Sequence, residues 1–241
     1  MVLAKIYYRD VIVDAGCRRG ILLEGLAVLV VGLTGSMGCG KSSVARLLAA
    51  RGGQVLDSDR LAREALVAGS PGLHQVVERF GRDILNPAGE VDRASLGLAL
   101  RADAAGWAAL EAIVHPQVRR LQAAAMVRLY RENPAAVIVL DEPLLFETGG
   151  DALCDVTVVV ACGEQQVQRL QQRGGMDFSV QQAALARQMA EVEKCRRADR
   201  VIDNSGSLLV TEEQVVLFWA WVGCLAGRGG GAWPERWRVY L

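Results

Sequence analysis

The sequence has no excess of charge of either sign. Its 241 residues contain 27 lysines and arginines and 27 aspartates and glutamates, so the formal net charge is zero. Nucleic-acid-binding proteins usually have a basic excess, because contacts to phosphates supply much of their affinity. The balance argues against a general nucleic-acid-binding protein, whereas local basic clusters stay available for the phosphates of a small ligand.

Cysteine pairs and metal-ligand spacings are also lacking. The cysteines at positions 17, 39, 154, 162, 195 and 224 form no C-x-x-C pair, and none has a histidine at metal-binding spacing. This argues against a disulfide framework and against a zinc site. We expect reduced thiols in a cytoplasmic protein, with organellar targeting by the N-terminal segment left open.

Long hydrophobic runs are absent as well. A membrane span needs roughly 18 consecutive apolar residues, and the longest candidate, residues 215–226, has 12. We interpret it as a buried helix or an interfacial segment, and expect no stable membrane span. Residues 1–27 lack the layout of a signal peptide, since acidic and basic residues interrupt their apolar stretches. We expect an unstructured extension there, with a transit peptide as a weaker alternative.

Short apolar runs alternate with helical patterns through the rest of the chain. Such alternation predicts an α/β fold with a parallel sheet flanked by helices, and ligands bind at the carboxyl ends of its strands. The five expected strands are residues 28–33, 54–56, 136–140, 156–161 and 201–202. The first is followed by an expected helix over 41–51, and the last by one over 207–222.

A long helical block separates the second and third strands. Residues 60–132 are almost wholly helical in pattern, interrupted at Pro71, at 81–89 and at His115–Pro116. This is more than one crossover needs, so it predicts an inserted helical subdomain. Two further helices are expected over 165–172 and 180–195. The domain then covers 28–222, and we leave the tail, 223–241, unassigned.

One motif points directly to nucleotide binding. Residues 35–42 read G-x-x-x-x-G-K-S between an expected strand and an expected helix, the context that supports a P-loop. Its glycines, Gly35, Gly38 and Gly40, let backbone N–H groups wrap a phosphate. Lys41 then reaches the β- and γ-phosphates, and the hydroxyl of Ser42 binds Mg²⁺. The alternative is a purely structural role, as a glycine-rich turn before an ordinary helix.

Two aspartates follow the second expected strand. A kinase needs a carboxylate that orients or deprotonates the acceptor hydroxyl. Asp57 and Asp59 fall at the ligand edge of the sheet, and strand alternation would put them on one side. The alternative, which is compatible with catalysis, is that Asp59 caps the helix at Arg60.

Several strings in a fixed order extend these motifs into a family resemblance. The segment GLTGSMGCGKSSVARLLAARGGQVLDSDRLARE resembles the amino-terminal signature of the dephospho-coenzyme A (dephospho-CoA) kinase family. The similarity continues through PGLHQVVERFGRDIL, LEAIVHP, DEPLLFE and ADRVIDNSGS, over roughly residues 30–216. The resemblance implies a P-loop kinase with a helical acceptor-binding insertion at about 60–132 and a short helical lid at about 169–191. It implies Mg²⁺ as cofactor.

The resemblance also implies the reaction and its residues. The family phosphorylates the ribose 3′-hydroxyl of dephospho-CoA with ATP, which gives CoA and ADP. The catalytic residues implied are Asp59, Lys41, Asp57 and Arg169. The ATP-binding residues implied are Gly35, Gly38, Cys39, Gly40, Lys41, Ser42, Ser43, Arg173 and Asn204. The acceptor-binding residues implied are His115, Pro143, Leu144, Leu145 and Glu147. The metal ligand implied is Ser42.

The chain departs from the family pattern at four places. These are the extension 1–27, a slightly long lid turn at 174–177, Gly149–Gly150 after Glu147, and Ala190 where the family commonly has proline. Two other functions stay open. One is a nucleoside or nucleotide kinase of the same fold, and the other is a P-loop binding protein without transferase activity. Oligomeric state cannot be predicted from the sequence.

Overall fold

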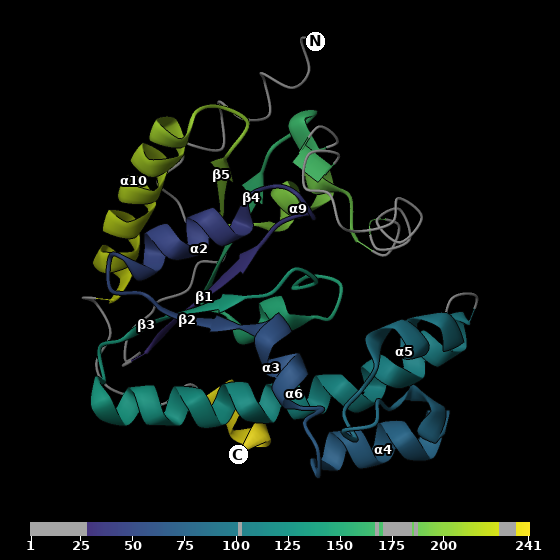
Figure 1. The fold of residues 1–241 in the computed structure, drawn as a ribbon. Coiled ribbons are helices and arrows are strands. Elements are labelled where there is room, and N and C mark those ends of the chain that lie inside the picture. The colour runs from purple at the N-terminus through teal and green to yellow at the C-terminus, as the bar shows by residue number, and fades with distance from the viewer. Residues whose placement is uncertain (1–27, 101–102, 167–168, 171–184, 186–187, 227–234) are drawn as a thin grey trace. The chain divides into compact units, whose positions relative to one another are not determined.

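A computed structural model describes residues 28–100, 103–166, 169–170, 185, 188–226 and 235–241 (Figure 1). These residues form two compact units. The core unit comprises the described residues up to Leu56 and from Leu129 to Glu235. The helical unit comprises Asp57–Arg128 and Arg236–Leu241. Each unit is described by itself.

A five-stranded parallel sheet organises the core unit, which confirms the predicted fold class. The strands are β1 (Leu29–Thr34), β2 (Gln54–Asp57), β3 (Val137–Asp141), β4 (Val156–Ala161) and β5 (Arg200–Asp203). Their order is β2-β3-β1-β4-β5. β1 runs parallel to β3 and β4, with Leu29 opposite Val137 and Val31 opposite Val156. A central strand is covered on both faces, which explains the unbroken apolar run of β1.

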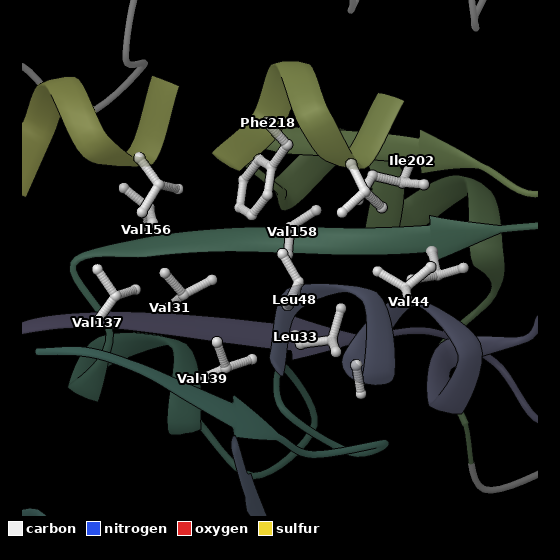
Figure 2. Packing of buried hydrophobic residues seen from close by; sticks show 14 of the residues in the cluster. Val31, Leu33, Val44, Leu48, Val137, Val139, Val156, Val158, Ile202 and Phe218 are labelled. Atoms are coloured by element: carbon white, nitrogen blue, oxygen red, sulfur yellow. The ribbon is translucent and has the colours of Figure 1, made fainter. Parts of the chain in front are cut away.

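Two helices cover one face of this sheet. They are α2 (Lys41–Ala49) and α10 (Leu208–Ala226). Figure 2 shows Leu48 of α2 and Phe218 of α10 meeting Val31 and Val158 of the sheet, and all four are buried. On the opposite face of β4, Val159 packs with Phe146 and Ala198, which follows α9 (Glu191–Arg197). The sheet is thus packed on both faces at β4, the neighbour of β1, which leads into the P-loop.

The helix α10 has an apolar surface beyond its buried face. Leu209 and Leu217 are exposed, whereas Val215, Phe218 and Val222 are buried. By length and composition, Leu208–Leu225 is also the one helix in the described part of the chain that could cross a membrane. About a fifth of that stretch, 22%, is buried inside the protein.

The helical unit contains four α-helices in its described residues. They are α3 (Ser58–Glu64), α4 (Pro71–Phe80), α5 (Arg93–Ala99) and α6 (Ala104–Glu132), whose last residues belong to the core unit. Short 3₁₀ helices occur at η1 (Arg82–Ile84) and η3 (Glu235–Tyr240), and a third, η2 (Gly150–Leu153), lies in the core unit. Val76, Ile84, Leu96, Leu100 and Leu110 form the unit's own hydrophobic cluster.

Two expected helix boundaries are wrong. His115–Pro116 does not interrupt the helical block, because α6 runs through Pro116. A proline removes one helical hydrogen bond, and the alanine, leucine and arginine residues around it are strong helix formers that carry the helix across. The helix expected over 180–195 is also not continuous. Residues 188–190 are not helical, and α9 begins only at Glu191.

Candidate functional site

The P-loop connects β1 to α2 along the path that the glycine spacing predicts. Gly40 precedes α2 with φ of 89°, a left-handed conformation that favours glycine. A Cβ at Gly40 would collide with the amide of Asn204, and one at Gly35 would collide with the carbonyl of Val160. These two glycines are therefore required by the packing, and the loop leaves the amino end of α2 open to an anion.

The lysine of the P-loop pairs with an acid from the neighbouring strand. The Nζ of Lys41 forms an ion pair with Oδ1 of Asp141, the last residue of β3. Both side chains are mostly buried, with 15% and 10% of their surfaces exposed. β3 lies next to β1 in the sheet. The loop that follows β1 and the carboxyl end of β3 therefore place an ammonium and a carboxylate side by side at the ligand edge.

The other side of the P-loop borders a cavity of about 390 Å³. Its lining includes Gly38, Gly40, Ser43, Arg169 and Asn204, all of which the sequence assigned to ATP binding or catalysis. The core unit thus brings these five predicted residues together. Cavities of this size lie in the range of small-molecule sites.

Asn204 and Arg169 both bind the backbone of the P-loop. The Nδ2 of Asn204 donates to the carbonyl of Cys39 at 2.7 Å, and its Oδ1 accepts from Oγ1 of Thr211 at 2.7 Å. Arg169 donates to the carbonyls of Cys39, at 3.4 Å, and Asn204, at 2.8 Å. Both side chains therefore hold the wall of the cavity in place.

The thiol of Cys39 is buried beneath the loop. Burial raises the pKa of Cys39 to about 11, since a thiolate would lose its hydration there. The group that Cys39 contributes to the phosphate site is thus its backbone, while the thiol stays neutral at physiological pH.

Cys39 should resist alkylation, because only the thiolate reacts. At pH 7.5 we expect iodoacetamide to modify the exposed Cys224 at least about 10-fold faster than Cys39. Raising the pH towards 10 should accelerate the reaction at Cys39 without a plateau, since its pKa of about 11 lies higher still. Peptide mass spectrometry measures both rates. Equal rates at pH 7.5 would contradict the buried, neutral thiol.

The segment after β3 is held in place by a buried lysine of α9. Lys194 of α9 is fully buried, and its Nζ donates to the carbonyl of Pro143 at 2.7 Å and contacts Oε1 of Glu147 at 3.0 Å. Oε1 of Glu147 also accepts from the backbone N–H of Met189 at 2.7 Å. The carbonyl of Pro143 takes a second hydrogen bond, at 3.2 Å, from Oγ1 of Thr34 at the end of β1.

The predicted acceptor residues of this segment have different surroundings. Leu145 is fully buried and its side chain contacts the backbone position of Gly32 in β1. Oε1 of Glu147 is occupied by Lys194 and Met189, whereas Pro143 and Leu144 are half-buried. Of the four, Pro143 and Leu144 have the surface that a ligand could touch.

Replacing Lys194 with methionine should destabilise the protein by about 3 kcal/mol, because the partly buried Glu147 carboxylate loses its partner. Methionine keeps most of the side-chain volume, so the change isolates the charge. The control Glu193→Gln breaks the exposed pair with Arg197 and should cost less than about 1 kcal/mol. Urea unfolding measures both. Similar small losses for the two variants would mean that the buried pair contributes little.

The two aspartates after β2 differ from expectation in which one caps the helix. α3 begins at Ser58, and Oδ1 of Asp57 accepts from the N–H of Arg60 at 3.0 Å. The cap is therefore Asp57 and not Asp59. Asp59 lies in the first turn of α3, so strand alternation does not relate the two. Asp59 is exposed, and no hydrogen bond or ion pair of its side chain occurs among the described residues.

A buried polar network in the helical unit supports the start of α3. The Nε2 of the fully buried Gln122 donates to Oγ of Ser58 at 3.0 Å, and its Oε1 accepts from Arg119 at 2.9 Å. His115, one helical turn before Arg119 on α6, is half-buried and also has an interaction partner. Because Ser58 precedes Asp59, this network orients the backbone that carries the predicted base.

Some predicted site residues are not among those that the structure describes. Arg173, the turn 174–177 and most of the expected lid over 169–191 lie outside the described residues, and so does the extension 1–27. The sequence reasoning in turn missed Asp141, Lys194 and Gln122. An acid that ends an apolar strand was a usable signal for Asp141, whereas nothing local distinguishes Lys194 or Gln122.

Two residues near the P-loop offer oxygen donors to a magnesium ion. Mg²⁺ prefers oxygen ligands and keeps several waters. Ser42 has an exposed side chain at the start of α2, and Asp141 has a carboxylate beside Lys41. No cluster of three acidic, histidine or cysteine residues suited to a metal occurs in the part that the structure describes. These oxygen donors suit a magnesium ion that binds together with a nucleotide better than one that the protein holds permanently.

Comparison with known proteins identifies the family. The family model described as Dephospho-CoA kinase matches residues 29–209. A dephospho-CoA kinase of Symbiobacterium thermophilum is 42% identical over 202 residues, covering 83% of this chain and 83% of that protein. A dephospho-CoA kinase of Geobacter metallireducens is 41% identical over 193 residues, covering 80% and 96% respectively.

Solved structures agree with the fold. A Thermus thermophilus protein, 36% identical, matches with a TM-score of 0.67 over 80% of this chain and 96% of its own. A dephospho-CoA kinase from Campylobacter jejuni, 24% identical, matches with a TM-score of 0.60 over 81% of this chain and 97% of its own, which supports the fold alone.

Proposed function

Since the chain belongs to the dephospho-CoA kinase family, we propose how its residues bind the two substrates and promote the transfer. The reaction is the ATP-dependent phosphorylation of dephospho-CoA at its ribose 3′-hydroxyl, the last step of CoA biosynthesis. The observation that carries the proposal is the P-loop whose lysine pairs with an acid at the ligand edge of the sheet. The residue roles are our proposal.

The core unit binds ATP. The backbone N–H groups of residues 35–42 and the amino end of α2 surround the phosphates. Lys41 exchanges its pairing with Asp141 for the β- and γ-phosphate oxygens. The cavity of about 390 Å³ beside the loop takes the nucleoside. Because both polar atoms of the Asn204 amide are already bonded within the protein, we propose that Asn204 shapes this cavity rather than reading the base.

Ser42 and Asp141 would hold the magnesium ion that accompanies ATP. The bound ion neutralises negative charge on the β- and γ-phosphates. Ser42 supplies a hydroxyl oxygen, and Asp141, once released by Lys41, supplies a carboxylate that orders water near the ion. Arg169 and Arg173 are proposed to stabilise the charge on the transferred group from the lid side.

Asp59 is proposed as the general base. Its exposed carboxylate accepts the proton of the 3′-hydroxyl while that oxygen bonds to the γ-phosphorus and the bond to the ADP oxygen breaks. Asp57 supports it by capping α3, and the network from Gln122 to Ser58 fixes the same helix start. Most of the acceleration then comes from positioning and electrostatics.

The acceptor contacts are proposed to come from His115, Pro143 and Leu144. Leu145 and Glu147 support them from inside the fold, by packing on β1 and by pairing with Lys194. We further propose a cytoplasmic location, in accord with the free state of all five described cysteines and with the bacterial origin of the relatives above.

An acceptor panel tests this function. Formation of ADP is measured with dephospho-CoA, adenosine, pantothenate and nucleoside monophosphates, each with and without Mg²⁺. We expect turnover that depends on dephospho-CoA and on the metal, with kcat/KM at least about 100-fold above the other acceptors. Preference for a nucleoside monophosphate would instead identify a nucleotide kinase, and acceptor-independent hydrolysis would contradict a transferase.

A further inference from the structure

One residue of the P-loop has both of its backbone polar groups bonded to side chains from distant parts of the chain. The backbone N–H of Met37 donates to Oε1 of Gln188 at 2.9 Å. The carbonyl of Met37 accepts from Nε2 of Gln166 at 2.8 Å. Met37 lies between Gly35 and Gly38, in the loop whose backbone is proposed to surround the phosphates. None of the roles proposed above includes either glutamine.

Side-chain amides suit this task better than charged groups would. A P-loop must present its backbone N–H groups in fixed directions, because each is aimed at a phosphate oxygen. The peptide planes on both sides of Met37 could rotate if its N–H and carbonyl had no partners. An amide oxygen accepts the N–H without adding negative charge near the phosphates, and an amide NH₂ group donates to the carbonyl. The two glutamines can therefore fix this part of the loop and leave its charge to Lys41.

Gln188 begins a segment that also contacts the residues after β3. The next residue, Met189, donates its backbone N–H to Oε1 of Glu147 at 2.7 Å. The Nζ of Lys194 donates to the carbonyl of Pro143 at 2.7 Å. Residues 188–194 therefore bond both to the P-loop and to segment 143–147, which carries the proposed acceptor contacts Pro143 and Leu144.

The same segment is also anchored to the sheet. Glu191, the first residue of α9, accepts from the backbone N–H groups of Cys162, at 3.0 Å, and Gly163, at 2.9 Å. Both of these residues follow β4, which lies next to β1. Lys194 is fully buried on the same helix. Because Gln188 is followed by residues that are fixed on the core, its side chain can position Met37 rather than follow it.

We propose that Gln188 is a positioning residue for the phosphoryl transfer. It fixes the P-loop backbone at Met37, and residues 189–194 keep that backbone in a constant position relative to segment 143–147. The γ-phosphoryl group and the acceptor hydroxyl are thereby kept in line, an alignment in which a displacement of about 1 Å can lower the rate roughly 100-fold. The proposal rests on the proposed function, since it requires ATP in the P-loop and an acceptor beside Pro143.

Replacing Gln188 with methionine tests this role. Methionine has a similar length and volume but no oxygen to accept the N–H of Met37. We expect kcat with MgATP and dephospho-CoA to fall about 10- to 100-fold. The KM for ATP should stay within about 3-fold of wild type, because Lys41 and the amino end of α2 still bind the phosphates. Steady-state kinetics with each substrate varied in turn measures both values.

Two further variants identify the group responsible. Gln188→Glu keeps an oxygen at the same reach, so its kcat should return to within about 3-fold of wild type. Its KM for ATP should rise, since the added negative charge repels the phosphates. Asn133→Leu is the matched control, because the amide oxygen of Asn133 also accepts from a backbone N–H, that of Ala135 at 3.0 Å. Asn133 precedes β3, at the amino ends of the strands, and its kcat and KM values should stay within about 2-fold of wild type.

The outcomes separate this proposal from the proposed function. Wild-type protein that fails to phosphorylate dephospho-CoA would overturn the function before any variant is compared. With an active wild type, an unchanged kcat in Gln188→Met would overturn the positioning role alone. A kcat that Gln188→Glu does not recover would also contradict it, because the accepting oxygen would then not be the group that matters. If Gln188→Met does not fold, as judged by a thermal melt, kcat and KM of Gln188→Ala decide by the same criteria.

Discussion

Replacing Lys41 with alanine is expected to lower kcat by about 10³-fold or more, because the ammonium that binds the β- and γ-phosphates is lost from a preorganised site. Because Lys41 forms an ion pair with Asp141, the substitution should also lower the stability of the fold. Removing the ammonium from this largely buried carboxylate costs about 1–3 kcal/mol. The protein should therefore remain folded at 25 °C, with a lower melting temperature.

Kinetics and a thermal melt on the same preparation measure these two effects. Arg51→Ala is the control, since Arg51 lies just beyond the carboxyl end of the same helix and its guanidinium donates to the carbonyl of Leu47 at 2.9 Å. Its kcat should stay within about 3-fold of wild type, as expected for a contact outside the site. A Lys41→Ala variant with near-normal turnover would contradict the P-loop assignment.

Replacing Asp59 with asparagine is expected to lower kcat by about 10²- to 10⁴-fold, the range typical of lost acid–base catalysis. Asparagine is nearly isosteric but cannot take up the proton of the acceptor hydroxyl. Because the side chain of Asp59 is exposed and Asp57 caps the helix, the melting temperature should hardly change. ATP affinity should also stay close to wild type.

Asp57→Asn provides the matched control for Asp59→Asn. Asparagine caps helices as well as aspartate does, so α3 should stay intact, and we expect kcat to fall far less than in Asp59→Asn. A large fall in the melting temperature of Asp59→Asn with little loss of kcat would make Asp59 structural. A raised KM for ATP with unchanged kcat would move it to nucleotide binding.

The features that the sequence predicted well are those set by local physics. Glycine spacing identified the P-loop because only residues without a Cβ fit at Gly35 and Gly40. Apolar runs located the five strands, most clearly β1, β3 and β4, which are buried along their whole length. Strand ends were displaced by one or two residues, as at β3, which ends at Asp141 rather than 140, because pairing with the neighbouring strand decides where a ladder stops.

The features that the sequence could not predict depend on residues far apart in the chain. Lys41 and Asp141 are 100 positions apart, and Lys194 and Pro143 are 51 apart. Only the parallel sheet and α9 bring them together. The continuation of α6 through Pro116 was hidden for a different reason. A proline locally disfavours a helix, so the surrounding residues, rather than Pro116, decided the outcome.

The central claim, phosphoryl transfer to one hydroxyl of dephospho-CoA, is tested most directly by locating the phosphate in the product. The protein is incubated with MgATP and dephospho-CoA, and the purified product is examined by phosphorus–proton NMR correlation. The account predicts a single new phosphomonoester whose phosphorus couples to the ribose H3′, formed in equal amount to ADP. A phosphate that couples to H2′, or ADP accompanied only by inorganic phosphate, would contradict it.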